Sequence, residues 1–146
     1  MLRPIATVFI LAVAVQVTFA FIDHPRETII LKLSDKDVIQ TNSDSNLKPR
    51  NINTYLGTLS AGHHLQGETL YTTQIEHRNN RNNVVLALDL VLQVQGITHF
   101  VSAENINGSE AVVCETANTL GSSRSTIRVR IAPSSTARLR VLVGTH

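Results

Sequence analysis

The chain has 146 residues, with 13 Lys or Arg, 11 Asp or Glu and a formal net charge of +2 at pH 7. This length fits one domain with an apolar core, and so nearly neutral a chain is not a general binder of nucleic acid or membrane surfaces. Its single cysteine, Cys114, excludes an intrachain disulfide, so the fold must rest on apolar packing and hydrogen bonds.

The first twenty residues have the features of a secretory signal peptide. Arg3 gives a short basic start, residues 5–15 are apolar except for Thr7, and small residues precede a cleavage position after Ala20. The apolar run is shorter than the roughly 20 residues that span a bilayer, so we expect no transmembrane segment. Cleavage leaves 126 residues with 12 basic and 11 acidic side chains, in a secreted, extracellular protein.

Residues 21–54 are predicted to form an N-terminal arm or linker. Within them, residues 28–33 are apolar enough for an edge strand. Residues 34–54 are polar, and such a composition cannot bury enough surface to offset the entropy lost on ordering. The compact β domain is therefore expected to span residues 55–146.

The clearest strand pattern lies at residues 84–94. Aliphatic side chains occupy every second position from Val84 to Val94, and the positions between them are half apolar, which predicts a central strand. An amphipathic helix is the competing interpretation, and the alternation and β-branched content argue against it. Further strands are expected at residues 68–77, 97–104, 110–116, 125–131 and 137–143.

Turn signals separate these segments. Asn107 and Gly108 both tolerate positive φ and predict a hairpin between the strands on either side of them, while Gly121 marks another turn. Pro133 and its neighbours are expected to close a final hairpin between residues 125–131 and 137–143. Six to seven short strands without a convincing helix predict an all-β fold, either an antiparallel β-sandwich or a barrel.

The final two predicted strands are rich in arginine. In a hairpin centred on Ser134, Arg128 would face Arg140 and Arg130 would face Arg138, with all four guanidinium groups on one side. Like charges placed directly opposite are destabilising, so such a face needs acidic neighbours or an anionic partner. The pattern suggests an anion-binding patch for a sulfated glycan, a phospholipid head group or an acidic protein. The alternative is a solvated face that nearby Glu or Asp residues balance.

Asn107, Gly108 and Ser109 form the one N-glycosylation sequon of the sequence. On a secreted chain, a sequon at a turn makes Asn107 a candidate glycosylation site, with an unmodified turn as the alternative.

Other candidate sites are weaker. His63, His64 and His77 suggest a metal site, but adjacent residues on a strand point to opposite faces and no further ligand completes the set, so no metal or cofactor is expected. Asp89 is expected to be a structural carboxylate. Cys114 is expected to be a small buried side chain, with an intermolecular disulfide as the alternative.

The sequence lacks Gly-x-Ser-x-Gly, a Gly-rich phosphate loop and His-Glu-x-x-His, and we expect no enzymatic activity.

An ordered series of turns and apolar positions runs from Gly67 to the end of the chain. Its parts are Gly67-Glu68-Thr69-Leu70-Tyr71, Ile97-Thr98, Glu104-Asn105, Gly108, Ala111-Val112-Val113, Gly121, the aliphatic positions Ile127, Val129 and Ile131, and residues 139–144. This series resembles the multiprotein bridging factor type-2 family of small secreted arthropod proteins. The family has a Gly-Gly-x-Gly turn where this chain keeps only Gly121, as in a divergent member.

The resemblance implies a small secreted all-β protein of a body fluid or glandular secretion, without enzymatic activity and without catalytic residues to carry over. The family name also implies a transcription coactivator that bridges other factors, a role that a signal peptide opposes. We therefore expect a secreted, non-enzymatic binding protein, whose partner is an unidentified protein or an anionic glycan or lipid. The alternatives are the coactivator and a carrier of a small apolar ligand.

Overall fold

The structure is a computed structural model, and it describes residues 25–39 and 57–146. The predicted signal peptide, its cleavage position at Ala20 and most of the predicted linker lie outside these residues. The described part contains eight strands and one short 3-10 helix. None of its helices is long and apolar enough to cross a membrane.

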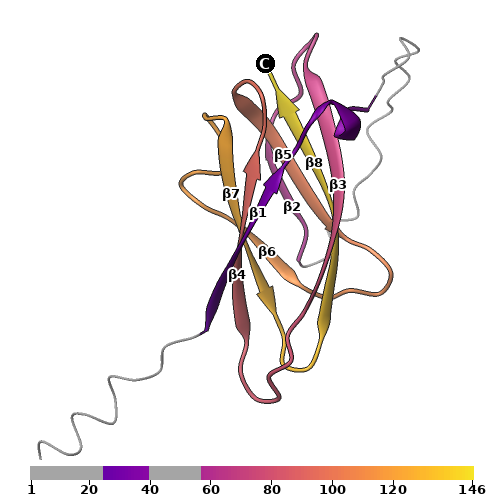
Figure 1. The fold of residues 1–146 in the computed structure, drawn as a ribbon, viewed down its shortest axis with the longest axis vertical. Coiled ribbons are helices and arrows are strands. Elements are labelled where there is room, and N and C mark those ends of the chain that lie inside the picture. Colours follow the sequence, from indigo (N-terminus) through magenta and orange to yellow (C-terminus); the bar gives the residue numbers. More distant parts are fainter. Residues whose placement is uncertain (1–24, 40–56) are drawn as a thin grey trace, which may run out of the picture.

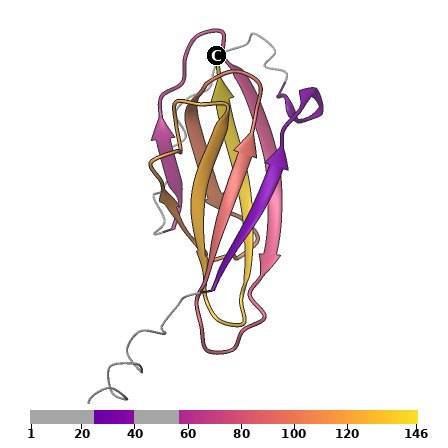
Figure 2. The ribbon, with the colours of Figure 1, turned by 60° about the vertical axis from the view of Figure 1, so that its left-hand side comes forward.

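The strands form two four-stranded sheets, which lie one behind the other as a sandwich (Figure 1, Figure 2). Sheet A has the order β1 (Arg26–Lys32), β4 (Leu86–Gln93), β7 (Arg124–Ile131), β6 (Val112–Glu115). Sheet B has the order β2 (Leu59–Gly62), β5 (Thr98–Asn105), β8 (Thr136–Thr145), β3 (Thr69–Arg78). The 3-10 helix η1 (Asp35–Asp37) follows β1.

The all-β prediction is confirmed, whereas the count of six to seven strands is wrong. The strand that sequence reasoning missed is β2, whose four residues are too few to show a clear alternation. The sheets are not closed into a barrel, and sheet A is mixed because β1 pairs with β4 in parallel. The expected edge strand near residue 28 is confirmed as β1, so this part of the predicted arm belongs to the sandwich.

The core fills the space between the two sheets. Strand β4 is the central strand that its alternation predicts, and its four leucines are at most 1% exposed. Burying one such side chain contributes roughly 1.5–3 kcal/mol. Most inward positions of the other central strands are also buried and aliphatic. On β7 and β8 they include Ile127, Val129, Ile131, Leu139, Val141 and Val143.

Backbone hydrogen bonds connect the two sheets at each side edge of the sandwich. After β1, the chain passes to sheet B, where Val38 forms an antiparallel bridge with Tyr71 and the Ile39 N–H donates to the Leu70 carbonyl at 2.8 Å. On the other side, the Val113 N–H donates to the Gly57 carbonyl at 3.0 Å. Strand β1 therefore runs along the edge next to β3 (Figure 1), and its outward side chains join the outer face of sheet A.

Strands β7 and β8 are consecutive in the chain, but they do not form the expected final hairpin. Strand β7 pairs with β4 and β6, and β8 pairs with β5 and β3. The short connection at residues 132–135 instead crosses from one sheet to the other at the lower end of Figure 1. A hairpin would bury the same mostly aliphatic inward side chains, so the alternation alone does not distinguish the two arrangements. In the sandwich, both backbone edges of each of these two strands are paired within its own sheet, and the inward side chains of the two sheets together form the core.

The Asn107–Gly108 turn has the predicted backbone conformation and an unexpected location. Both residues have positive φ, 53° and 76°, and the Ser109 N–H closes the turn on the Ile106 carbonyl at 3.1 Å. However, the turn joins β5 in sheet B to β6 in sheet A, so it does not close a hairpin.

Candidate anion-binding site

The outer face of sheet A collects basic side chains from two strands. On β7, the buried Ile127, Val129 and Ile131 point inward, so the alternate residues Arg124, Arg128 and Arg130 point outward. On β1, Arg26 and Lys32 stand level with the outward residues Ala87 and Gln93 of the intervening strand β4. Both Arg26 and Lys32 are exposed.

The predicted patch of four neighbouring arginines does not exist. Arg128 and Arg130 lie on the outer face of sheet A, whereas Arg138 and Arg140 lie on the outer face of sheet B, because β7 and β8 belong to different sheets. The two arginines of β7 are thus separated from the two arginines of β8 by the whole thickness of the core.

The two arginines of sheet B have acidic neighbours on adjacent strands. The Nε of Arg138 donates to Oε2 of Glu76 at 3.1 Å, and Nη1 of Arg140 donates to Oε1 of Glu104 at 3.2 Å. These pairs fit the alternative in which acidic residues balance the basic face, so we assign Arg138 and Arg140 no binding role.

Arg128 is also paired, and its partner is Asp89, directly opposite on β4. Its Nε donates to Oδ1 at 2.8 Å and its Nη2 to Oδ2 at 3.3 Å, a two-point contact. The hydrogen bond to Asp89, together with the Coulomb attraction of the carboxylate, raises the pKa of Arg128 above its already basic ordinary value. Asp89 is thus the structural carboxylate that the sequence suggested.

Arg26 and Arg130 differ from these three, since neither side chain has a hydrogen-bond or ion-pair partner among the described residues. They stand on either side of Ala87, level with it in the register of β1, β4 and β7. Two inter-strand spacings place their backbones about 10 Å apart. The small Ala87 side chain between them leaves a hollow.

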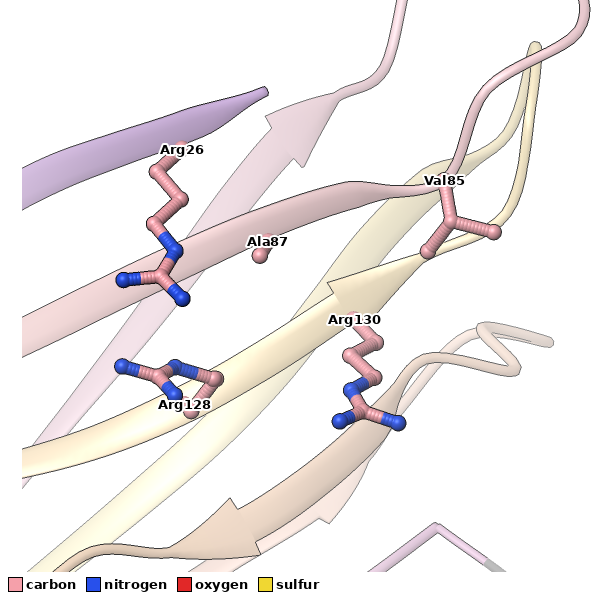
Figure 3. Close-up of a pocket in the computed structure, with 5 residues that line it drawn as sticks. All are labelled: Arg26, Val85, Ala87, Arg128 and Arg130. Atoms are coloured by element: carbon pink, nitrogen blue, oxygen red, sulfur yellow. The ribbon is translucent and has the colours of Figure 1, made fainter. Parts of the chain in front are cut away.

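This hollow is a surface cleft of about 320 Å³ lined by Arg26, Val85, Ala87, Arg128 and Arg130. Figure 3 shows the three arginines arranged around Ala87, with the Val85 methyl groups at one end. Guanidinium groups bind carboxylate, sulfate and phosphate oxygens through two parallel N–H donors, so this cleft is suited to an oxyanion.

The charge of the two outer faces differs. Outward strand positions of sheet A carry five cationic side chains, Arg26, Lys32, Arg124, Arg128 and Arg130, against the single carboxylate of Asp89. Outward strand positions of sheet B carry three, Arg78, Arg138 and Arg140, against the two carboxylates of Glu76 and Glu104. The described part of the molecule is therefore positively charged on one side, although the whole chain is nearly neutral.

Sequence reasoning missed Arg26, because it assigned this residue to an arm outside the β domain. The local signal was weak, because residues 26–32 have three consecutive aliphatic residues and no alternation of charged and aliphatic side chains. Which strand β1 joins, and in which register, depends on contacts about sixty residues along the chain and is not visible locally.

The histidines do not form the suggested metal site. His77 contacts Glu27 at 2.9 Å, while His64 contacts Glu68 in the loop between β2 and β3. His99 approaches the same Glu68 from β5, with Nε2 3.4 Å from Oε2. Within the described residues, no group of three His, Cys, Asp or Glu side chains is arranged to hold a metal ion.

Cys114 and Asn107 both lie at the surface. Cys114 is half-buried on the outward side of β6, level with Arg128, so the expectation of a buried cysteine is wrong. The cause is its position in the alternation, since Val113 takes the inward place. Asn107 is exposed at its turn, as a glycosylation site requires.

Comparisons with protein-family models, curated proteins and solved structures find no match to this chain.

Proposed function

We propose that this protein is a secreted, non-enzymatic binding protein that holds an anionic ligand on the outer face of sheet A. The observation that carries this proposal is the pair of exposed arginines, Arg26 and Arg130, which flank Ala87 without an acidic partner among the described residues. Two unpaired guanidinium groups on one cleft repel each other, and an oxyanion between them removes that repulsion.

Arg128 has a supporting role in this cleft. Its contact with Asp89 fixes the guanidinium group in place, and its charge is largely neutralised there. The ligand therefore meets two free cations, and a third that is held in position. Val85, which is 42% exposed, adds an apolar contact at the rim.

The proposal is tested by exchanging two arginines for serine on one face at a time. We expect Arg26→Ser with Arg130→Ser to weaken binding to a heparin column and to lower the salt concentration of elution. Arg138→Ser with Arg140→Ser is the matched control, because it removes the same charge from the opposite face. A charge-assisted hydrogen bond contributes roughly 1.5–3 kcal/mol, so the first variant should lose at least about tenfold in affinity. Equal loss in both variants would mean that net charge, and no particular site, governs retention.

Secretion is part of the proposal, and it rests on the sequence of residues 1–20. Intact mass spectrometry of protein from the medium of a secreting cell is expected to give a mature chain that begins at Phe21. Retention in the cell with residues 1–20 uncleaved would instead favour the coactivator role that the family name implies.

We also propose that the chain is a divergent member of the multiprotein bridging factor type-2 family. The support is the series of turns and apolar positions from Gly67 onward. Several of these turns have a backbone conformation that favours glycine, since Gly67, Gly108 and Gly121 all have positive φ.

A further inference from the structure

The outer face of sheet A has a second pair of basic side chains, at the opposite end from Arg26 and Arg130. Lys32 on β1 and Arg124 on β7 both stand level with Gln93 of β4, and both are exposed. Neither side chain has an ion-pair partner in the part of the chain that the structure describes.

The two pairs repeat the same arrangement along the sheet. Each pair has one residue on β1 and one on β7, with β4 between them, at Ala87 for the first pair and at Gln93 for the second. The six-residue step from Ala87 to Gln93 places the pairs about 20 Å apart, at roughly 3.3 Å per residue. A compact anion reaches one pair only, whereas an extended polyanion reaches both.

The surface between the two pairs has no unpaired negative charge that would repel an anionic chain. Its single carboxylate, Asp89, is neutralised by Arg128. The next row across the three strands consists of Ile30, Val91 and Thr126, which are apolar or hydroxyl side chains, and Ile30 is 50% exposed. A ligand that carries anionic groups at intervals, with less polar surface between them, matches this order of charged and neutral rows.

We infer that the ligand is a linear sulfated polysaccharide that crosses the outer face of sheet A from the Arg26–Arg130 pair to the Lys32–Arg124 pair. This inference rests on the proposed anion-binding function and adds the class of ligand and its length. An extended chain of sulfates fits better than a membrane surface, because the first pair borders a hollow and the exposed aliphatic side chains are separated by charged rows. Several contacts with one polyanion also release several counterions, which makes binding steeply dependent on salt.

The test compares size-fractionated heparin oligosaccharides, from disaccharide upward, by titration calorimetry at fixed ionic strength. For the unmodified protein, affinity is expected to rise at the length that first spans about 20 Å and to level off beyond it. Lys32→Ser with Arg124→Ser should abolish this rise and leave the affinity for the shortest fragments within about twofold. Arg26→Ser with Arg130→Ser should weaken binding at every length, and Arg138→Ser with Arg140→Ser is the control.

The outcomes separate the two proposals. If affinity is independent of length but still needs Arg26 and Arg130, the polysaccharide inference is overturned and the anion-binding function stands. If no variant changes binding at any length, both fail. Binding of poly-glutamate with the affinity of long heparin, or stronger retention on vesicles of anionic phospholipid, would assign the face to an acidic polypeptide or a membrane and would overturn the inference. Circular dichroism of each variant checks that the sandwich is intact.

Discussion

Asp89 on β4 and Arg128 on β7 are direct cross-strand neighbours that share two hydrogen bonds, of 2.8 and 3.3 Å. This pair neutralises the only carboxylate among the outward strand positions of sheet A. It divides the five basic side chains of this face into one that is held and four that are free to bind.

Asp89→Asn is expected to strengthen binding to heparin, because it frees Arg128 and adds one unit of positive charge to the face. The cost in stability should not exceed about 1 kcal/mol, since the pair is partly exposed. Affinity and the urea midpoint would be measured together. Glu104→Gln makes the same change of charge beside Arg140 on sheet B, and it should leave heparin affinity nearly unchanged. Weaker binding of Asp89→Asn would show that Arg128 must be held in place to contribute.

Binding should be independent of pH between about pH 6 and pH 9. The groups that carry it in our proposal are arginines and a lysine, which are residue types whose ordinary pKa values lie above this range. Asp89 raises the pKa of Arg128, so the contribution of this group to stability is complete below its unfolded pKa and is lost only as pH rises beyond its folded pKa. Calorimetric titrations at several pH values and constant ionic strength measure the binding affinity. A fall in affinity as pH rises through the histidine range would place a histidine in the site.

Asn79→Ala is expected to lower the free energy of unfolding by about 2 kcal/mol or more. The buried Asn79 amide donates to the carbonyls of Val84, Ile131 and Ala132, and its Oδ1 accepts from the Arg81 N–H. It thereby joins the β3–β4 loop to the end of β7, and the alanine variant leaves these groups without their partner. Urea denaturation measures the loss.

The exposed neighbour Asn80 provides the control for this variant. Asn80→Ala should change the stability by no more than about 0.5 kcal/mol. Equal effects of the two substitutions would contradict the structural role of the Asn79 amide.

Gly62→Ala is expected to be more destabilising than Gly67→Ala, although both residues have positive φ, 79° and 76°. A Cβ at Gly62 would overlap the His99 carbonyl oxygen, whereas nothing lies within 4 Å of a Cβ at Gly67. Gly67→Ala should thus cost only the backbone strain, about 1–2 kcal/mol. Thermal unfolding of the two variants gives the comparison, and similar melting temperatures would refute the close approach of β2 and β5.

Asn107→Asp is expected to remove an N-linked glycan without disturbing the turn. Aspartate tolerates the positive φ of 53° at this position, whereas Ser109→Ala would also break the hydrogen bonds of the Ser109 hydroxyl with Asn105 and Arg138. Protein secreted by a eukaryotic cell would be analysed by intact mass before and after glycosidase treatment. A glycosidase-sensitive mass in the wild type alone assigns the glycan to Asn107, and no sensitivity in either would show that the turn is unmodified.

The sequence by itself determines where most strands lie. The alternation of aliphatic residues in β4 identifies a central strand, because burial on one face imposes a period of two. The residues that point outward follow from the same period, so Arg128 and Arg130 could be assigned to one side of their strand, and Arg138 and Arg140 to one side of theirs.

Only the tertiary structure decides which strands become neighbours. The alternation of β7 and β8 fits a hairpin and a crossing between sheets equally well, since both arrangements bury the same aliphatic side chains. The crossing puts Arg128 and Arg138 on opposite sides of the molecule, and the pairing of β1 with β4 brings Arg26 beside Ala87. Local periodicity indicates which face of a strand is buried, but which strand lies next to it in the sheet depends on the packing of the whole core.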